Sequence, residues 1–247
     1  MKACYILLIL LLTAVGYSQE VAPIQTDRPD QTETAAIVPA GLFQIETGFS
    51  YQRESSNEKS FGLPSILWKY GVNENFELRV ITEFNSEKLK QGTQSGFAPV
   101  LLGFKTKLAN EKGIIPQTSF IAHVGLPNVS SKNYKTEFFA PQFRFAMLHT
   151  LSNKATFSYN LGAEWDGFSP EPVFIYSSSF GFALSDKMGS YIELFGFIPQ
   201  VLKSNHSIDG GITYLINNNF MVDLSSGIGI SKNAPKYYWA IGFSFRI

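Results

Sequence analysis

The sequence predicts an all-β protein, a transmembrane antiparallel up-and-down β-barrel of about 12 strands, within a range of about 10–14. From Leu42 to the end, alternating segments of mostly about 9–12 residues recur, which is the length that a tilted strand needs to cross a bilayer. Large apolar side chains share one face of these segments, and charged side chains share the other. Short turns alternate with longer polar loops, as in outer-membrane barrels.

The last segment, Tyr237 to Ile247, shows the alternation without a break. Its odd-numbered positions are large and apolar, whereas its even-numbered positions are mostly small or polar. A soluble sandwich would place the large face in its core, but a membrane barrel places it against lipid. Because the chain stops on this strand, its edge needs another strand to close on it. We therefore expect the first and last strands to pair.

Residues 1–18 predict a secretory signal peptide. Lys2 supplies the positive start, residues 5–12 form an apolar run too short for a membrane-spanning helix, and Gly16-Tyr17-Ser18 is a small-x-small cleavage site. A membrane anchor is the alternative. Because Cys4 lies in this segment, the mature chain is expected to have no cysteine, and therefore neither disulfide nor thiol chemistry.

Charge and hydropathy narrow the function classes. The 20 basic and 20 acidic residues balance, so no electrostatic argument favours binding to nucleic acid. No stretch after the signal is long and apolar enough for a membrane helix. Entry into a membrane would therefore require a closed barrel, because open strand edges cannot satisfy their backbone groups in lipid.

Residues 19–41 form a polar N-terminal lead-in or plug segment before the barrel of residues 42–247. The segment contains Pro29 and shows neither helical nor strand periodicity. Four charged residues, Asp27, Arg28, Asp30 and Glu33, lie within seven positions. One interpretation is a plug that folds into the lumen and pairs with wall charges such as Lys69, Arg79 and Lys105. The alternatives are a solvated periplasmic lead-in and a ligand site.

The barrel region divides into alternating segments and connections. The predicted strands are 42–52, 62–71, 76–84, 95–108, 116–126, 137–150, 155–165, 173–184, 190–198, 206–216, 220–230 and 237–247. Connections after even-numbered strands are short and rich in Asn, Asp and Gly, whereas those after odd-numbered strands are longer. This asymmetry places both termini in the periplasm. Pro64, Pro99 and Pro141 each lack a ladder donor and predict bulges or strand ends near a rim.

The polar face supplies the candidate site residues. Its members are expected to line a wet or ion-paired lumen, because burying unpaired ions in a dry sandwich core would cost several kcal/mol each. These candidates are Glu46, Lys69, Glu77, Arg79, Glu83, Lys105, Gln117, His123, Arg144, Glu164, Asp209 and Asp223, and the same face includes Asn160 and Glu193. Acids and bases concentrate on different strands, which predicts a transverse electric field across the lumen.

The segment Thr26-Asp-Arg-Pro-Asp-Gln-Thr-Glu33, followed by residues 38–49 (V-P-A-G-L-F-Q-I-E-T-G-F), resembles a family of bacterial outer-membrane transporters. That family is labelled "meta-pathway of phenol degradation" proteins, and the resemblance covers the mature chain from about residue 24. It implies an outer-membrane barrel that takes up small, including aromatic, compounds. The octapeptide with the following P-x-G-x-x-Q-[IV]-E carries most of the specificity, and the remainder is typical of barrels in general.

The predicted function is a passive outer-membrane channel or transporter for small solutes, with hydrophobic or aromatic compounds among the candidates. The alternative is a structural or partner-binding barrel with a closed, ion-paired lumen. Barrels of 8 strands are filled by side chains and those of 16–18 strands hold a channel. A barrel of about 12 strands lies between these sizes, so the strand count alone does not distinguish a filled lumen from an open one. The expected partners are outer-membrane lipid, the solute, and the barrel-assembly machinery, which would bind the C-terminal strand; no cofactor, metal or nucleic acid is expected.

A lipid-modifying hydrolase is the less favoured third class, and we predict no enzyme. Outer-membrane phospholipases of the A type, which are also 12-stranded barrels, carry a nucleophilic serine and a base histidine as H-x-S. None of the three histidines in this sequence has a serine two positions after it, so no H-x-S pattern is present. His149 is expected on the lipid face and His206 at a loop edge. His123 alone is expected to face the lumen, with Ser119 two side-chain pairs away on the same strand.

Overall fold

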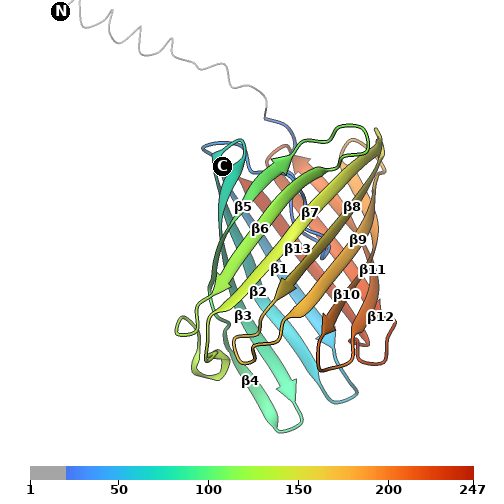
Figure 1. The fold of residues 1–247 in the computed structure, drawn as a ribbon. Coiled ribbons are helices and arrows are strands. Elements are labelled where there is room, and N and C mark those ends of the chain that lie inside the picture. Colours follow the sequence, from blue (N-terminus) through green and yellow to red (C-terminus); the bar gives the residue numbers. More distant parts are fainter. Residues whose placement is uncertain (1–20) are drawn as a thin grey trace, which may run out of the picture.

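Alternating side chains and tight turns build a closed antiparallel barrel in the computed structural model, which describes residues 21–247 (Figure 1). The predicted signal peptide, residues 1–18, lies outside the described residues. The strands are β1 (Phe43–Arg53), β2 (Lys59–Asn73), β3 (Phe76–Leu89), β4 (Gly92–Phe97), β5 (Leu101–Ala109), β6 (Gln117–Gly125), β7 (Ala140–Ser152), β8 (Ala155–Glu164), β9 (Val173–Ala183), β10 (Met188–Pro199), β11 (Asn205–Asn217), β12 (Phe220–Gly229) and β13 (Tyr237–Arg246). A short 3-10 helix, η1 (Lys132–Tyr134), follows β6.

The first and last strands close the ring, as the alternation predicts. β1 pairs with β13 from Gln44 opposite Arg246 to Arg53 opposite Tyr237, and β2 pairs with β3. The sheet order is β2-β1-β13-β12-β11-β10-β9-β8-β7-β6-β5-β3-β4. Twelve strands form the closed ring, and the thirteenth, β4, lies outside the ring and pairs with β3 alone. The predicted barrel of about 12 antiparallel strands is confirmed, and no strand edge in the described ring faces lipid unpaired.

The prediction of a single strand over 95–108 is wrong. β4 and β5 occupy this stretch and are separated around Pro99, which has no backbone N–H for a ladder. The flanking amides donate elsewhere, with Ala98 N 2.9 Å from Glu83 O and Val100 N 3.0 Å from Val129 O. β3 continues beyond the ring and pairs with β4 from Phe84 opposite Phe97, so the predicted loop 85–94 is a protruding hairpin (Figure 1).

The other two prolines also lie where the ladder is irregular or ends. Pro64 lies at the register shift between Gly62 and Ser65 of β2, which is a bulge in the pairing with β3. Pro141 is the second residue of β7. The predicted association of proline with bulges and strand ends is therefore confirmed.

The two faces of the wall are the reverse of those in a soluble protein. The largest fully buried side chains include Arg79, Lys69 and Lys105, whereas Phe180 and Ile241 are 45% and 50% exposed on the outside. The buried apolar cluster is small and contains Ala35, Ile121 and Ala146, with Leu148 packed against it. The large apolar face therefore points outward to a hydrocarbon environment, and the sandwich interpretation is wrong.

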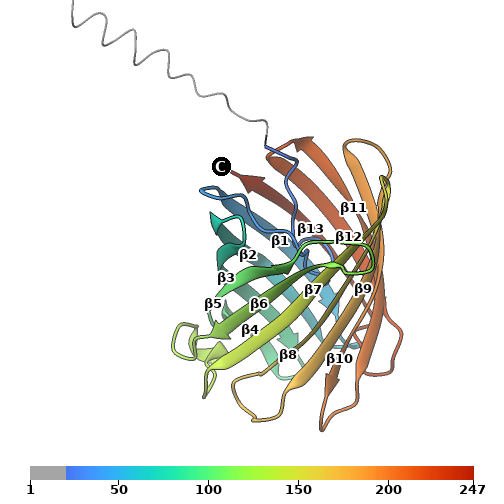
Figure 2. The same cartoon turned by 45° about the horizontal axis from the view of Figure 1, so that its top comes forward.

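Connection lengths sort by end of the barrel mostly as predicted, but residues 110–116 between β5 and β6 form a longer connection than the predicted tight turn. The end with the C-terminus carries the tight turns, and the opposite end carries the longer loops and the β3–β4 hairpin (Figure 1). We call these the short-turn end and the long-loop end. The described chain enters at the short-turn end and descends into the mouth of the barrel (Figure 2). Within residues 21–247, no helix is long and apolar enough to cross a bilayer.

Candidate functional site

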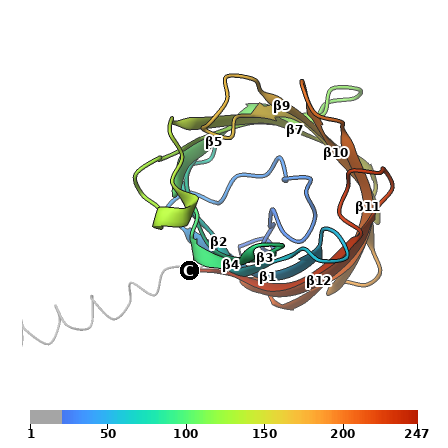
Figure 3. The same cartoon turned by 90° about the horizontal axis from the view of Figure 1, so that it is seen from below.

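Residues 21–41, which we call the lead-in segment, lie inside the ring of strands (Figure 3). Near the short-turn end, Ile24 N donates to Asn218 O at 2.8 Å, and after folding through the lumen the segment returns to the same end, where Gly41 N donates to Gly71 O at 2.7 Å. A Cβ on Gly71 would lie 2.3 Å from the carbonyl oxygens of both Val38 and Pro39. The wall therefore needs glycine at residue 71 to let the segment pass close by.

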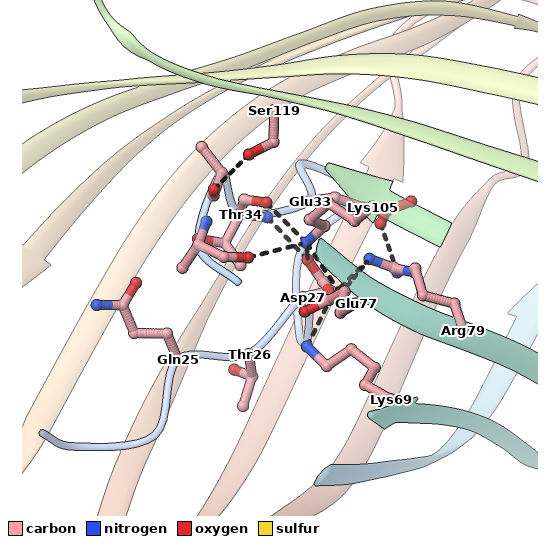
Figure 4. A network of polar contacts seen from close by, with 12 residues as sticks. Gln25, Thr26, Asp27, Glu33, Thr34, Lys69, Glu77, Arg79, Lys105 and Ser119 are labelled. Carbon is pink, nitrogen blue, oxygen red and sulfur yellow. Dashed lines mark hydrogen bonds and ion pairs between the residues drawn. The ribbon is translucent and has the colours of Figure 1, made fainter. Parts of the chain in front are cut away.

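Asp27 connects the lead-in segment to three bases from three strands (Figure 4). Its carboxylate lies 2.9 Å from Lys69 Nζ, 2.9 Å from Lys105 Nζ and 3.2 Å from Arg79 Nη1. Burial alone would raise the pKa of Asp27, but the three cations hold that pKa well below its usual value. The carboxylate is therefore ionised and fixed between β2, β3 and β5.

Glu46 on β1 extends this network to the backbone of the lead-in segment. Its carboxylate pairs with Lys69 and accepts hydrogen bonds from Asp27 N at 2.9 Å and Arg28 N at 3.1 Å. A buried carboxylate that accepts two backbone amides holds the main chain as well as a side chain. Residues 27 and 28 are thereby fixed in position as well as in charge.

Glu77 and Glu33 complete the basic side of the lumen. Glu77 lies 3.3 Å from Arg79 Nη1 and 3.9 Å from Lys105 Nζ, and it accepts Val38 N at 2.8 Å. Glu33 pairs with Arg79 Nη2 at 2.6 Å. We call Asp27, Glu33, Glu46 and Glu77, with Lys69, Arg79 and Lys105, the basic-side network; Figure 4 labels all of these residues except Glu46.

The opposite wall holds the tip of the lead-in segment by hydrogen bonds. Glu193 on β10 accepts Gln31 N at 2.8 Å and the Thr32 hydroxyl, and Thr32 also bonds to Ser177 at 2.7 Å. Asn160 on β8 accepts Glu33 N at 2.7 Å. These contacts orient residues 31–33, and Arg144 on β7 also donates to Gln31 O at 3.3 Å.

Arg28 forms the ion pair on this wall. Its Nη2 lies 2.9 Å from Asp223 Oδ1 and its Nε lies 3.3 Å from Asp223 Oδ2, which is a bidentate geometry. The Asp223 side chain is fully buried, and that of Arg28 is 20% exposed.

Asp209 and Asp30 add acidic groups beside Glu193. Asp209 faces Glu193 across the β10–β11 pair and accepts the hydroxyls of Tyr191 and Tyr238. Among residues 21–247, no Lys, Arg or His lies within 4.0 Å of Asp30, Glu193 or Asp209 in an ion pair. Burial and the neighbouring Asp209 carboxylate raise the pKa of Asp30 to about 8.

Two cavities lie on either side of the lead-in segment. The long-loop cavity has a volume of about 470 Å³ and reaches Gln52 and Asn205, whereas the short-turn cavity of about 480 Å³ reaches Lys154. Arg28 and Pro29 line both cavities. These two residues are therefore part of the partition between the two halves of the lumen.

The remaining predicted site residues lie on the inner wall with separate contacts. Glu83 accepts the Ser65 hydroxyl at 2.9 Å beside the long-loop cavity, and Gln117 donates to Ala35 O at 3.3 Å. Arg144 lies 3.8 Å from Glu33 and 3.9 Å from Glu164.

His123 and Ser119, the residues weighed for hydrolase chemistry, are not brought together. Ser119 Oγ donates to Ala35 O at 2.7 Å, so its proton is directed at the lead-in segment. His123 is buried, and its Nε2 has no hydrogen-bond partner. Among residues 21–247, no group of three or more His, Cys, Asp and Glu side chains is placed to hold a metal ion.

The sequence reasoning missed Thr32, Gly48 and Gly242. Thr32 belongs to the charged octapeptide, so its position could have suggested a role. Gly48 and Gly242 occupy inward positions near the middle of β1 and β13, where a glycine can mark the close approach of another group. Without the three-dimensional pairing, nothing indicates which group approaches.

Comparisons with known proteins agree with this architecture. The family model described as "Putative MetA-pathway of phenol degradation" matches residues 26–247. An outer membrane channel from Pseudomonas putida F1 superposes with a TM-score of 0.69 at 11% identity, over 89% of this chain and 99% of that one. The NanC porin superposes with a TM-score of 0.56 at 8% identity, over 82% of this chain and 98% of that one. The translocator domain of the autotransporter NalP from Neisseria meningitidis superposes with a TM-score of 0.54 at 12% identity, over 85% of this chain and 90% of that one.

None of the curated protein sequences compared matches this chain. The family match covers most of the sequence, and the structural neighbours share its barrel. The chain has the fold of an outer-membrane β-barrel, and it belongs to the family described as "Putative MetA-pathway of phenol degradation".

Proposed function

We propose that this protein is a passive channel for small solutes whose bore is narrowed by the lead-in segment. The observation that carries the proposal is the pair of cavities, about 470 and 480 Å³, that meet at Arg28 and Pro29. Each is large enough for a small organic molecule. A solute that passes Arg28 and Pro29 would travel from one cavity to the other, and so between the two ends of the barrel, while the ring of strands stays closed.

Small aromatic compounds are the first class of solute to assay. The family description refers to phenol degradation, and the long-loop cavity contains the rings of Phe195, Phe197 and Tyr238. The centroid of Phe195 lies 6.3 Å from that of Phe197 and 6.5 Å from that of Tyr238. Rings at these separations present a partly apolar wall that favours flat solutes.

Liposome swelling tests the proposal. Liposomes containing the purified barrel should swell in isotonic solutions of small neutral solutes faster than empty liposomes, and the rate should fall as solute size increases. Heat-dependent gel mobility should first show that the barrel is folded. Swelling no faster than that of empty liposomes, for every solute and with folded protein, would reject the channel.

A closed barrel that serves a structural or partner-binding role is the second candidate. The basic-side network favours it, because Lys69, Arg79 and Lys105 are each at most 2% exposed and are joined to the lead-in segment by short ion pairs. The swelling assay separates the two roles.

Catalysis is not part of the proposal. Ser119 donates its hydroxyl proton to Ala35 O instead of to a histidine. A phospholipase assay should therefore give equal, background rates for the wild type and for the Ser119→Ala and His123→Ala variants.

A further inference from the structure

The inner wall has a recess where Arg28 lies. Gly48 of β1 is paired with Gly242 of β13, and Gly242 is paired with Asp223 of β12. A Cβ on Gly48 would lie 1.9 Å from Arg28 Nη1, and one on Gly242 would lie 2.5 Å from Arg28 Nε. The guanidinium therefore occupies space that two side chains would otherwise fill. We call Gly48, Gly242 and Asp223 the glycine seat.

The glycine seat holds Arg28 by fewer contacts than the basic side holds Asp27. Arg28 has one bidentate ion pair, with Asp223, whereas Asp27 contacts three cations. The Arg28 side chain also keeps 20% of its surface exposed, so solvent reaches one side of the pair. Because Arg28 borders both cavities, its ion pair with Asp223 is a contact that must break for the cavities to join at this point.

The wall around the glycine seat is acidic. Glu193, Asp209 and Asp223 project inward from the consecutive strands β10, β11 and β12, and all three are at most 4% exposed. The fully buried bases lie on β2, β3 and β5 and are paired with the carboxylates of the basic-side network. If Arg28 left its seat, Asp223 would lose the one cation that it contacts among the described residues.

We propose that Arg28 is a latch: seated on Gly48 and Gly242, it closes the connection between the two cavities, and its release opens a passage lined by carboxylates that selects small cations over anions. This proposal rests on the channel function and specifies the charge class of its solutes. A row of carboxylates in a narrow pore attracts cations and repels anions. A solute carrying an ammonium or guanidinium group would also compete with Arg28 for Asp223.

Single-channel recording across a KCl gradient tests the latch. Arg28→Ala should increase conductance several-fold, and its reversal potential should shift toward the potassium equilibrium potential. Gly48→Ala should also increase conductance while keeping the arginine, because the new methyl group displaces the guanidinium. Asp223→Asn in the Arg28→Ala background should reduce the preference for potassium. Millimolar guanidinium chloride should raise the open probability of the wild type but not of Arg28→Ala.

Two variants serve as matched controls. Arg53→Ala removes an arginine whose contacts include Ser55 O and Ser56 O near the long-loop rim, and Gly210→Ala adds a methyl group outside both cavities, 3.0 Å from Tyr191 O. Both should conduct like the wild type. Heat-dependent gel mobility reports folding, and Gly48→Ala provides the test if Arg28→Ala does not fold.

Wild-type conductance in both Arg28→Ala and Gly48→Ala, or a preference for chloride in the opened channel, would overturn the latch. A variant lacking residues 25–34 separates this failure from failure of the channel function. If that variant conducts well while Arg28→Ala does not, the latch is wrong and the channel stands. If no folded variant conducts, both proposals fail.

Discussion

The two sides of the lumen hold the same short segment by different means. On the basic side, three buried cations surround the Asp27 carboxylate, and carboxylates fill the space between them. On the acidic side, Glu193 accepts a backbone amide and a hydroxyl, and Arg28 supplies the cation. Compensated charge therefore fixes the segment at one wall, whereas hydrogen bonds and the Arg28–Asp223 ion pair hold it at the other.

The energetic consequence follows from burial. Removing one partner from a buried ion pair leaves an uncompensated charge in a poorly solvated place, which is far more costly than losing an exposed pair. Lys69, Arg79 and Lys105 therefore depend on the acids that face them. Glu193 and Asp209 face each other without a cation beside them, so replacing one of them with a neutral side chain leaves no base unpaired.

The largest effect is expected from Asp27→Asn. The amide cannot compensate Lys69, Arg79 and Lys105, so docking of the lead-in segment should weaken by about 3–5 kcal/mol. Limited proteolysis should then cleave residues 21–41 in the variant but not in the wild type. The matched control is Asp186→Asn, which removes an exposed acid from the β9–β10 turn. Equal protection of the Asp27→Asn and wild-type segments would contradict the account of the basic side.

A smaller loss is expected from Glu77→Gln. The side chain can still accept Val38 N, but it no longer compensates Arg79 and Lys105, both of which keep Asp27. We expect a cost of about 1–3 kcal/mol, measured as the same protease protection. If Glu77→Gln lost as much protease protection as Asp27→Asn, then Asp27 would not be the main acid that compensates the three bases of the basic-side network.

The acidic side should respond to pH. Asp30 ionises near 3.8 when unperturbed, whereas its docked pKa is about 8, so docking requires proton uptake between these values. Docking of the tip is therefore strongest at low pH, weakens as the pH rises toward 8, and changes no further above it. Amide hydrogen exchange, corrected for its intrinsic pH dependence, should show a several-fold loss of protection at residues 29–33 between pH 6 and pH 8. Asp30→Asn should reduce this change; an identical pH profile in the variant would refute the assignment to Asp30.

The smallest effect is expected from Glu193→Gln. The amide oxygen retains an acceptor for Gln31 N or Thr32, and the substitution leaves no wall cation unpaired. Protease protection should change by no more than about 1 kcal/mol. If Glu193→Gln lost as much protease protection as Asp27→Asn, then the acidic and basic sides of the lumen would hold the lead-in segment equally strongly, contrary to the difference described above.

Local patterns predict the barrel because its wall repeats them. Alternation in Tyr237–Ile247 and the Asn-rich turns identify strands and their order, and these were enough for closure between β1 and β13. The same alternation continues through β4, where no local signal separates a strand in the ring from a hairpin beyond it. Only Pro99 marks the break, and a proline alone fits either a bulge or a strand end.

The site was predictable as a set of charges but not as a set of contacts. Asp27, Lys69, Arg79 and Lys105 could be named because charge on an inward face is unusual. The wall that each acid meets depends on the register around the ring and on the fold of the lead-in segment, which has no periodicity. The glycine seat was hidden because Gly48 and Gly242 act through the side chains that they lack.

Single-channel conductance of the folded barrel, with and without residues 25–34, shows whether the lead-in segment divides the lumen. We expect the wild type to conduct weakly, and we expect removal of the segment to raise conductance several-fold, because the two cavities then join into one bore. Equal conductance of the two proteins, with both shown to be folded, would contradict the claim that this segment divides the lumen.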